Sequence, residues 1–155
     1  VVTTEEMRRE TPAAAIGADS VIMSAAPADF RPVEIAGAKM KKAEDGSSPS
    51  IELVQNPDIL VELVQARSNP AQVIVGFAAE TGDENGSVVE HATAKFQRKG
   101  CDLLVVNDVG HEQVFDQPEN QVTILSQTSD PVSVPKASKT VVAHVILDHV
   151  VQRLK

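Results

Sequence analysis

Two kinds of apolar pattern alternate along the chain. Short apolar runs, which predict strands, occupy residues 20–24, 51–55, 72–79, 102–106 and 121–126. Apolar residues spaced three and four apart predict amphipathic helices, which begin near residues 3, 56, 87 and 138. Strands that alternate with helices are typical of an α/β fold. The pattern therefore predicts one Rossmann-like domain over residues 1–155, with a mainly parallel sheet flanked by helices in three layers.

The sequence also marks the ends of the second and third helices. Asn56-Pro57-Asp58 is expected to start the second helix, with the asparagine as N-cap and the proline at the first helical position. Ser87 is expected to begin the third helix and Gly100 to end it. This helix then carries Lys95 and Lys99 on one face, because residues four apart are neighbours on a helix.

Residues 33–50 carry glycines, prolines, serines and charges of both signs without a sustained period, so they are expected to form a loop. The loop contains Lys39-Met40-Lys41-Lys42. Loops of this length in compact domains are usually functional. A run of charges taken alone, however, is more often a solvated surface, so both interpretations stay open.

Charge and composition narrow the classes of function. The net charge of −8 argues against nucleic acid or an anionic membrane as a partner, since both attract a positive surface. No apolar run is long enough to span a bilayer and residues 1–6 do not form a signal peptide, so we expect a cytoplasmic protein. The single cysteine, Cys101, excludes an internal disulfide framework. At the entrance of a predicted strand it is expected to be a buried small apolar residue rather than a nucleophile.

Unusual residues follow the carboxyl ends of three predicted strands, at 24–30, 76–81 and 107–108. Ligands of open α/β sheets bind in the crevice beyond these ends. Lys95 and Lys99 can converge there on one anion, although such a pair alone is more often surface-exposed near a helix C-terminus. The chain has no glycine-rich dinucleotide motif, no Walker-type loop and no Gly-x-Ser-x-Gly. The residues alone thus indicate an α/β domain that binds an anion.

Five blocks, taken in order, are more specific than any one of them. They are residues 24–32 (SAAPADFRP), 39–42 (KMKK), 56–60 (NPDIL), 76–81 (GFAAET) and 95–108 (KFQRKGCDLLVVND). Together they resemble phosphopantothenoylcysteine synthetase, a ligase of coenzyme A biosynthesis that uses CTP to join 4′-phosphopantothenate to L-cysteine. The resemblance spans nearly the whole chain.

The resemblance implies a site in which one set of residues binds CTP. The set is Ser24, Ala25, Ala26, Asp29, Lys39, Asn56, Pro57, Asp58, Ile59, Phe77, Lys95 and Lys99. Lys39 is expected to be catalytic, closing over the reacting groups, and Lys95 and Lys99 to meet the triphosphate. Asp29 is expected to hold Mg²⁺. Phe77 would hold the cytidine, although a phenylalanine is by itself more often a core residue. The implied reaction forms an acyl-cytidylate with loss of pyrophosphate, and the amine of cysteine then displaces CMP.

The resemblance also implies a homodimer or higher oligomer, and a flavin-dependent phosphopantothenoylcysteine decarboxylase fused to or associated with the ligase. The family opens with a glycine-rich strand and turn and an asparagine-containing segment, and this sequence lacks both. One alternative is therefore a truncated, non-catalytic module that binds CTP or dimerises. A fragment of a Rossmann-like oxidoreductase is a further alternative, which the missing glycine fingerprint disfavours.

Overall fold

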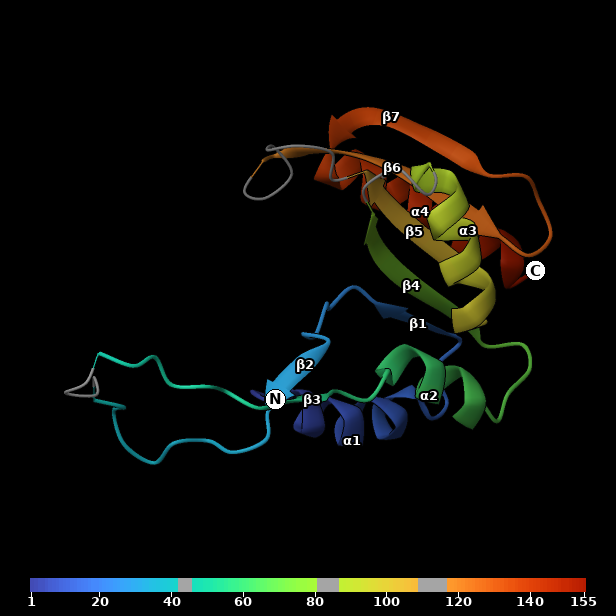
Figure 1. Ribbon diagram of the computed structural model, residues 1–155. Helices are drawn as coiled ribbons and strands as arrows, with labels where there is room; N and C mark the ends of the chain where they lie inside the picture. The colour runs from blue at the N-terminus through green and yellow to red at the C-terminus, as the bar shows by residue number, and fades with distance from the viewer. Residues whose placement is uncertain (42–45, 81–86, 109–116) are drawn as a thin grey trace.

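The elements of the chain are drawn in Figure 1, a computed structural model that describes residues 1–41, 46–80, 87–108 and 117–155. Its helices are α1 (Thr4–Ala15), α2 (Ile59–Ala66), α3 (Val88–Lys99) and α4 (Lys139–Arg153). Its strands are β1 (Ser20–Met23), β2 (Phe30–Pro32), β3 (Leu53–Gln55), β4 (Val73–Glu80), β5 (Leu103–Asp108), β6 (Glu119–Ser126) and β7 (Val132–Ser138). No helix within these ranges has the length and apolar character that a membrane span requires.

The main sheet has the strand order β1-β4-β5-β6-β7. β1 runs parallel to β4 and β4 parallel to β5. β6 and β7 extend the sheet with antiparallel pairing. The predicted α/β class is confirmed: three of the five strands form the parallel part, and helices flank the sheet (Figure 1).

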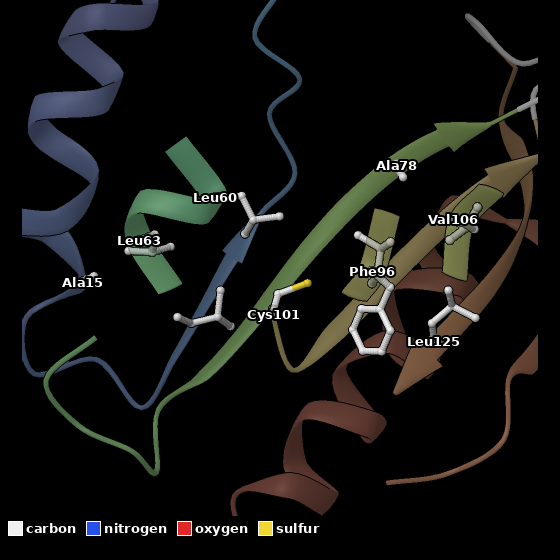
Figure 2. Close-up of a cluster of buried hydrophobic side chains, with 11 residues drawn as sticks. Ala15, Leu60, Leu63, Ala78, Phe96, Cys101, Val106 and Leu125 are labelled. Carbon is white, nitrogen blue, oxygen red and sulfur yellow. The ribbon is translucent and has the colours of Figure 1, made fainter. Parts of the chain in front are cut away.

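Alternate residues of β4 face opposite sides of the sheet and pack into two apolar cores. Ile74 and Ala78 face α1, α2 and α3, in the cluster drawn in Figure 2. Val73 and Val75 belong to the other cluster, which includes the inward face of α4. The three predicted layers are therefore present. The period of two also places Gly76 and Glu80 on the α2–α3 side of β4.

Helix α2 approaches β4 closely at Gly76. A Cβ atom at this position would lie 2.4 Å from Leu60 Cδ2 and 3.2 Å from Leu104 Cδ1. Any larger residue would have to displace the Leu60 side chain, which is buried. Glycine here fixes how near the first turn of α2 lies to the strand.

The predicted start of α2 is wrong by two residues. The N-cap is Asp58, whose Oδ1 accepts a hydrogen bond from the Val61 N–H at 3.2 Å, and the helix begins at Ile59. Asn56 does not cap the helix and Pro57 precedes it. The reason is that the Asn56 side chain bonds across the chain to residues 28 and 31 instead, which leaves Asp58 to satisfy the helix N–H groups.

The predicted ends of α3 are confirmed. Ser87 is the N-cap and forms a capping box with Glu90: the Ser87 backbone N–H donates to the Glu90 carboxylate at 2.8 Å, and the Glu90 N–H donates to Ser87 Oγ at 3.3 Å. The bonds from Ser87 lower the pKa of Glu90. Gly100 ends the helix in the left-handed conformation, at φ 68°. These ends fix the rotation at which α3 presents its lysines.

Two strands differ from the sequence-based prediction. β2 lies where no strand was predicted, and it pairs antiparallel with β3 in a separate two-stranded ribbon. β7 is not predicted because it buries one residue, Val134, and contains Pro135. Proline is tolerated at a sheet edge, where β7 lies. The described residues between β2 and β3, 33–41 and 46–52, lie in the predicted loop and extend away from the sheet (Figure 1).

Candidate functional site

A pocket of about 270 Å³ lies at the carboxyl ends of β1 and β4. Its walls come from residues 25–29, from the segment that leads into α2, from the end of β4 and from the α3 lysines. This is the edge at which the sequence predicted a ligand site. The segments that meet here are separated in the chain by the β2–β3 ribbon and by α2, so the fold assembles the pocket.

Most of the residues assigned to CTP line this one pocket. They are Ala25, Ala26, Asp29, Asn56, Pro57, Asp58, Ile59, Phe77, Lys95 and Lys99. Ser24 and Lys39 do not line it. Lys39 is exposed in the loop between β2 and β3, so its catalytic role stays a prediction. Lys42 and Thr81, which belong to two of the blocks, lie outside the described residues.

Asn56 connects two walls of the pocket. Its Nδ2 donates to the Ala28 carbonyl at 2.7 Å, and its Oδ1 accepts from Arg31 Nη1 at 2.9 Å. The Asn56 backbone N–H donates to the Asp29 carbonyl at 2.8 Å. Both polar ends of the amide are thus engaged, so Asn56 positions residues 28–31. Each end of the amide keeps the capacity for one further hydrogen bond, because Nδ2 carries two hydrogens and Oδ1 has two lone pairs.

Each pocket lysine is paired with a carboxylate. Lys95 Nζ lies 2.5 Å from Glu80 Oε1, and Lys99 pairs with Asp58 Oδ2. The lysine side chains retain 31% and 17% of their exposure, respectively. They are therefore partly buried cations in a pocket rather than freely solvated surface residues.

Two residues that contact pocket side chains were not assigned to the site from the sequence, namely Glu80 and Arg31. Glu80 belongs to the block at 76–81 and Arg31 to the block at 24–32, yet neither had a role. The period of two in β4 could have placed Glu80 on the side of α3. Arg31 gave no comparable indication, because its partner Asn56 is reached through β2–β3 pairing.

The turn at residues 107–108 was expected to join the site; Asn107, the residue of it whose side chain the structure describes, does not line this pocket. Asn107 Oδ1 instead accepts a hydrogen bond from Asn120 Nδ2 at 2.9 Å. The bond holds the end of β5 to the start of β6, so Asn107 has a structural contact.

Cys101 is fully buried, as expected from the sequence. Burial raises the pKa of its thiol to about 11, so the thiolate is scarce at neutral pH. Figure 2 shows Cys101 within the cluster that also holds Phe96 and Leu60. Cys101 is a core residue rather than a nucleophile.

Among the described residues, no three His, Cys, Asp or Glu side chains come together in a way that could hold a metal ion. Asp29 can still offer one carboxylate to the pocket. Mg²⁺ commonly binds one or two carboxylates together with substrate phosphates and water. The donor set therefore fits a magnesium ion that arrives with a nucleotide, and does not fit a preformed all-protein metal site.

Comparison with known proteins identifies the relatives. Residues 1–154 match the family model described as the DNA/pantothenate metabolism flavoprotein C-terminal domain. The chain is 47% identical over 138 residues to the coenzyme A biosynthesis bifunctional protein CoaBC of Mycobacterium tuberculosis, covering 86% of this chain and 33% of that protein. It is 46% identical over 142 residues to CoaBC of Mycolicibacterium smegmatis, covering 89% and 34%. The chain thus spans about a third of the length of these curated relatives.

Solved structures agree in fold. A crystal structure of the C-terminal domain of a coenzyme A biosynthesis bifunctional protein CoaBC is similar with a TM-score of 0.70 and 28% identity, covering 97% of this chain and 62% of that one. A DNA/pantothenate metabolism flavoprotein from Streptococcus pneumoniae has a TM-score of 0.71 at 16% identity, covering 97% and 70%, a likeness of fold alone.

Proposed function

This chain belongs to the DNA/pantothenate metabolism flavoprotein C-terminal domain family, and on that premise we propose that it joins 4′-phosphopantothenate to L-cysteine with consumption of CTP. The names of its relatives support a place in coenzyme A biosynthesis. The proposal includes a cytoplasmic location, a homodimer or higher oligomer, and a decarboxylase in the same polypeptide. Support for the last comes from the bifunctional relatives, of which this chain matches about a third.

The observation that carries the proposal is the pocket itself. Lys95 and Lys99, one turn apart on α3, share it with Asp29 and with the start of α2. Ammonium groups and helix N-terminal N–H groups are the donors that a polyphosphate needs. Phe77 supplies an apolar wall against which a base could pack.

The proposed chemistry has two steps. A carboxylate oxygen of phosphopantothenate attacks the α-phosphorus of CTP, the bond to the β-phosphate breaks, and pyrophosphate leaves. The amine of cysteine then attacks the acyl carbon of the acyl-cytidylate, CMP leaves with the bonding electrons, and the amine loses a proton. Negative charge builds on oxygen in both steps, so Lys95 and Lys99 would lower the barriers by stabilising that charge.

Mg²⁺ would be held by the phosphates and by Asp29, where it would neutralise phosphate charge. Lys39, in the loop between β2 and β3, would act on the reacting groups if that loop folds over the pocket. Asn56 would keep the wall at residues 28–31 in place during both steps.

The test is calorimetric titration with CTP and Mg²⁺, with ATP as the control nucleotide, followed by pyrophosphate release on addition of phosphopantothenate. We expect CTP to bind in preference to ATP. Lys99→Gln should weaken CTP binding about tenfold or more, as expected for a lost charged hydrogen bond. Lys136→Gln removes an exposed lysine outside the pocket and serves as the matched control. Absence of any preference for CTP would sink the proposal.

A second candidate is a module that binds CTP without catalysis. The position of Lys39, exposed and outside the pocket, favours it. Binding of CTP without pyrophosphate release in the same experiment would establish this second function instead.

A further inference from the structure

The two lysines of the pocket already bind anions. Glu80 and Asp58 supply one carboxylate each, so the four charges cancel. A polyphosphate that enters the pocket meets a neutral cluster rather than two free cations. To bind either lysine, it must take the place of a carboxylate or share the cation with it.

The two carboxylates differ in how they are held. Asp58 also caps α2 through Oδ1, so its side chain is tied to the helix and keeps its position when Lys99 moves. Glu80 is the last residue of β4, has a longer side chain, and is not the N-cap of any helix that the structure describes. Its carboxylate is fixed by Lys95, with 18% of the Glu80 side chain exposed. Glu80 is the carboxylate that can leave.

We propose that Glu80 is an exchange counterion, which holds Lys95 in the pocket and yields it to a phosphate group when a polyphosphate binds. The inference rests on the proposed function, because it concerns how the same pocket takes its nucleotide. Glu80 is a positioning residue here: it acts on the ligand through Lys95.

The exchange has a defined effect on affinity. Breaking the Lys95–Glu80 pair opposes binding, and the displaced carboxylate repels the phosphates that replace it. Glu80 therefore weakens the binding of a triphosphate and also that of pyrophosphate. Pyrophosphate should therefore leave the site faster because Glu80 competes for Lys95, and the pair with Glu80 keeps Lys95 oriented.

Replacing Glu80 tests the inference, because the sign of the effect separates it from a structural role. Glu80→Gln keeps the size of the side chain and removes its charge. We expect it to lower the Kd for CTP with Mg²⁺, and for pyrophosphate alone, by roughly fivefold at low salt, the weight of a modest ion pair. Damage to the pocket would raise both constants. Pyrophosphate should also dissociate more slowly from the variant in stopped-flow measurements.

The matched control is Glu119→Gln. Glu119 also pairs with a lysine, Lys136 at 3.6 Å, and neither residue lines the pocket. Both variants lose one negative charge, so a general field effect would tighten binding equally in both. Glu80→Asp, which keeps the charge but withdraws it from Lys95 by one methylene, should fall between the wild type and Glu80→Gln, and it decides the matter if Glu80→Gln does not fold.

The outcomes separate the inference from the proposed function. Wild-type binding of CTP with unchanged or weaker binding by the Glu80 variants overturns the counterion role and leaves the function standing. Tighter pyrophosphate binding by Glu80→Gln without preference for CTP supports the counterion role and overturns the function. Equal tightening in Glu119→Gln overturns the counterion role. Failure of every protein to bind either ligand overturns both.

Discussion

Replacing Gly76 with alanine tests the close contact between β4 and α2. The new Cβ atom would lie 2.4 Å from Leu60 Cδ2, whereas carbon atoms in ordinary contact are about 3.5–4.0 Å apart. Leu60 must therefore retreat by roughly 1 Å. It has 6% exposure, so it cannot move into solvent without a shift of α2. Overpacking of this kind costs about 1–3 kcal/mol, and the lower backbone entropy of unfolded alanine offsets about 0.5 kcal/mol of that.

The assay follows from the composition. The chain has no Trp and no Tyr, so unfolding is best followed by circular dichroism or calorimetry. A net loss of about 0.5–2.5 kcal/mol should lower Tm by about 1–10 °C in a domain of this size. The control is Gly37→Ala in the loop between β2 and β3, where an added Cβ meets nothing within 4 Å. It should change stability by no more than about 0.5 kcal/mol.

A double-mutant cycle decides whether Leu60 is the residue responsible. Leu60→Ala alone should cost about 2–5 kcal/mol, because it leaves a cavity in the core. In the presence of Gly76→Ala the same change should cost at least about 1 kcal/mol less, since the new methyl group partly fills that cavity. Costs that simply add would refute the reasoning, and so would an unchanged Tm for Gly76→Ala. Since Leu60 also lines the pocket, Gly76→Ala should weaken CTP binding as well.

Three further predictions concern stability and its dependence on pH. Arg67→Met should destabilise the fold by about 2–4 kcal/mol in urea unfolding, because it leaves the Asp102 carboxylate, 15% exposed, without its cation at 2.7 Å; Arg9→Met, in an exposed pair, should cost less than about 1 kcal/mol. Burial of Cys101 favours its neutral thiol and raises its pKa, so the neutral thiol contributes to the stability of the fold. This contribution should be complete below about pH 9 and be lost as pH rises through about 11. In Cys101→Ala, the corresponding fall of Tm at high pH should be absent. The bonds from Ser87 lower the pKa of Glu90, so the ionised carboxylate contributes to stability above about pH 4.5, and this contribution is lost as pH falls. If Tm falls with acid in the same way in Glu90→Gln as in the wild type, this prediction is wrong.

The elements that the sequence predicts best are those with a clear pattern in their own residues. The apolar runs at 72–79 and 102–106 correspond to β4 and β5, because strands covered on both faces need apolar residues throughout. The ends of α3 were predictable since a capping box and a left-handed glycine are local features. β2 and β7 form because each pairs with a neighbouring strand. β2 has only three residues and β7 buries only one side chain, so neither shows an alternating apolar pattern in the sequence.

In the pocket, too, the sequence indicates what is local along the chain and not which distant residues pair. Ordered blocks along the chain were enough to nominate residues at the carboxyl ends of β1 and β4, where the topology brings them together. The charges that neutralise the lysines were not predictable from spacing on α3, because Lys99 pairs with a residue 41 positions away and Lys95 with one 15 positions away. Two lysines on one helix face therefore indicated an anion without revealing that each of them pairs with a carboxylate of the chain.

The segment Asn56-Pro57-Asp58 explains why the helix cap and the pocket cannot be separated. A cap at Asn56 would have used its side chain on the helix; the shift of the cap to Asp58 leaves the Asn56 amide for Ala28 and Arg31. Proline between them donates no N–H and restricts the backbone, which keeps the two side chains directed to different walls. Asp58 then serves the helix with one oxygen and Lys99 with the other. The contacts of these three consecutive residues thus connect residues 25–29 with α2 and α3. The contacts that start the helix therefore also position the walls of the pocket.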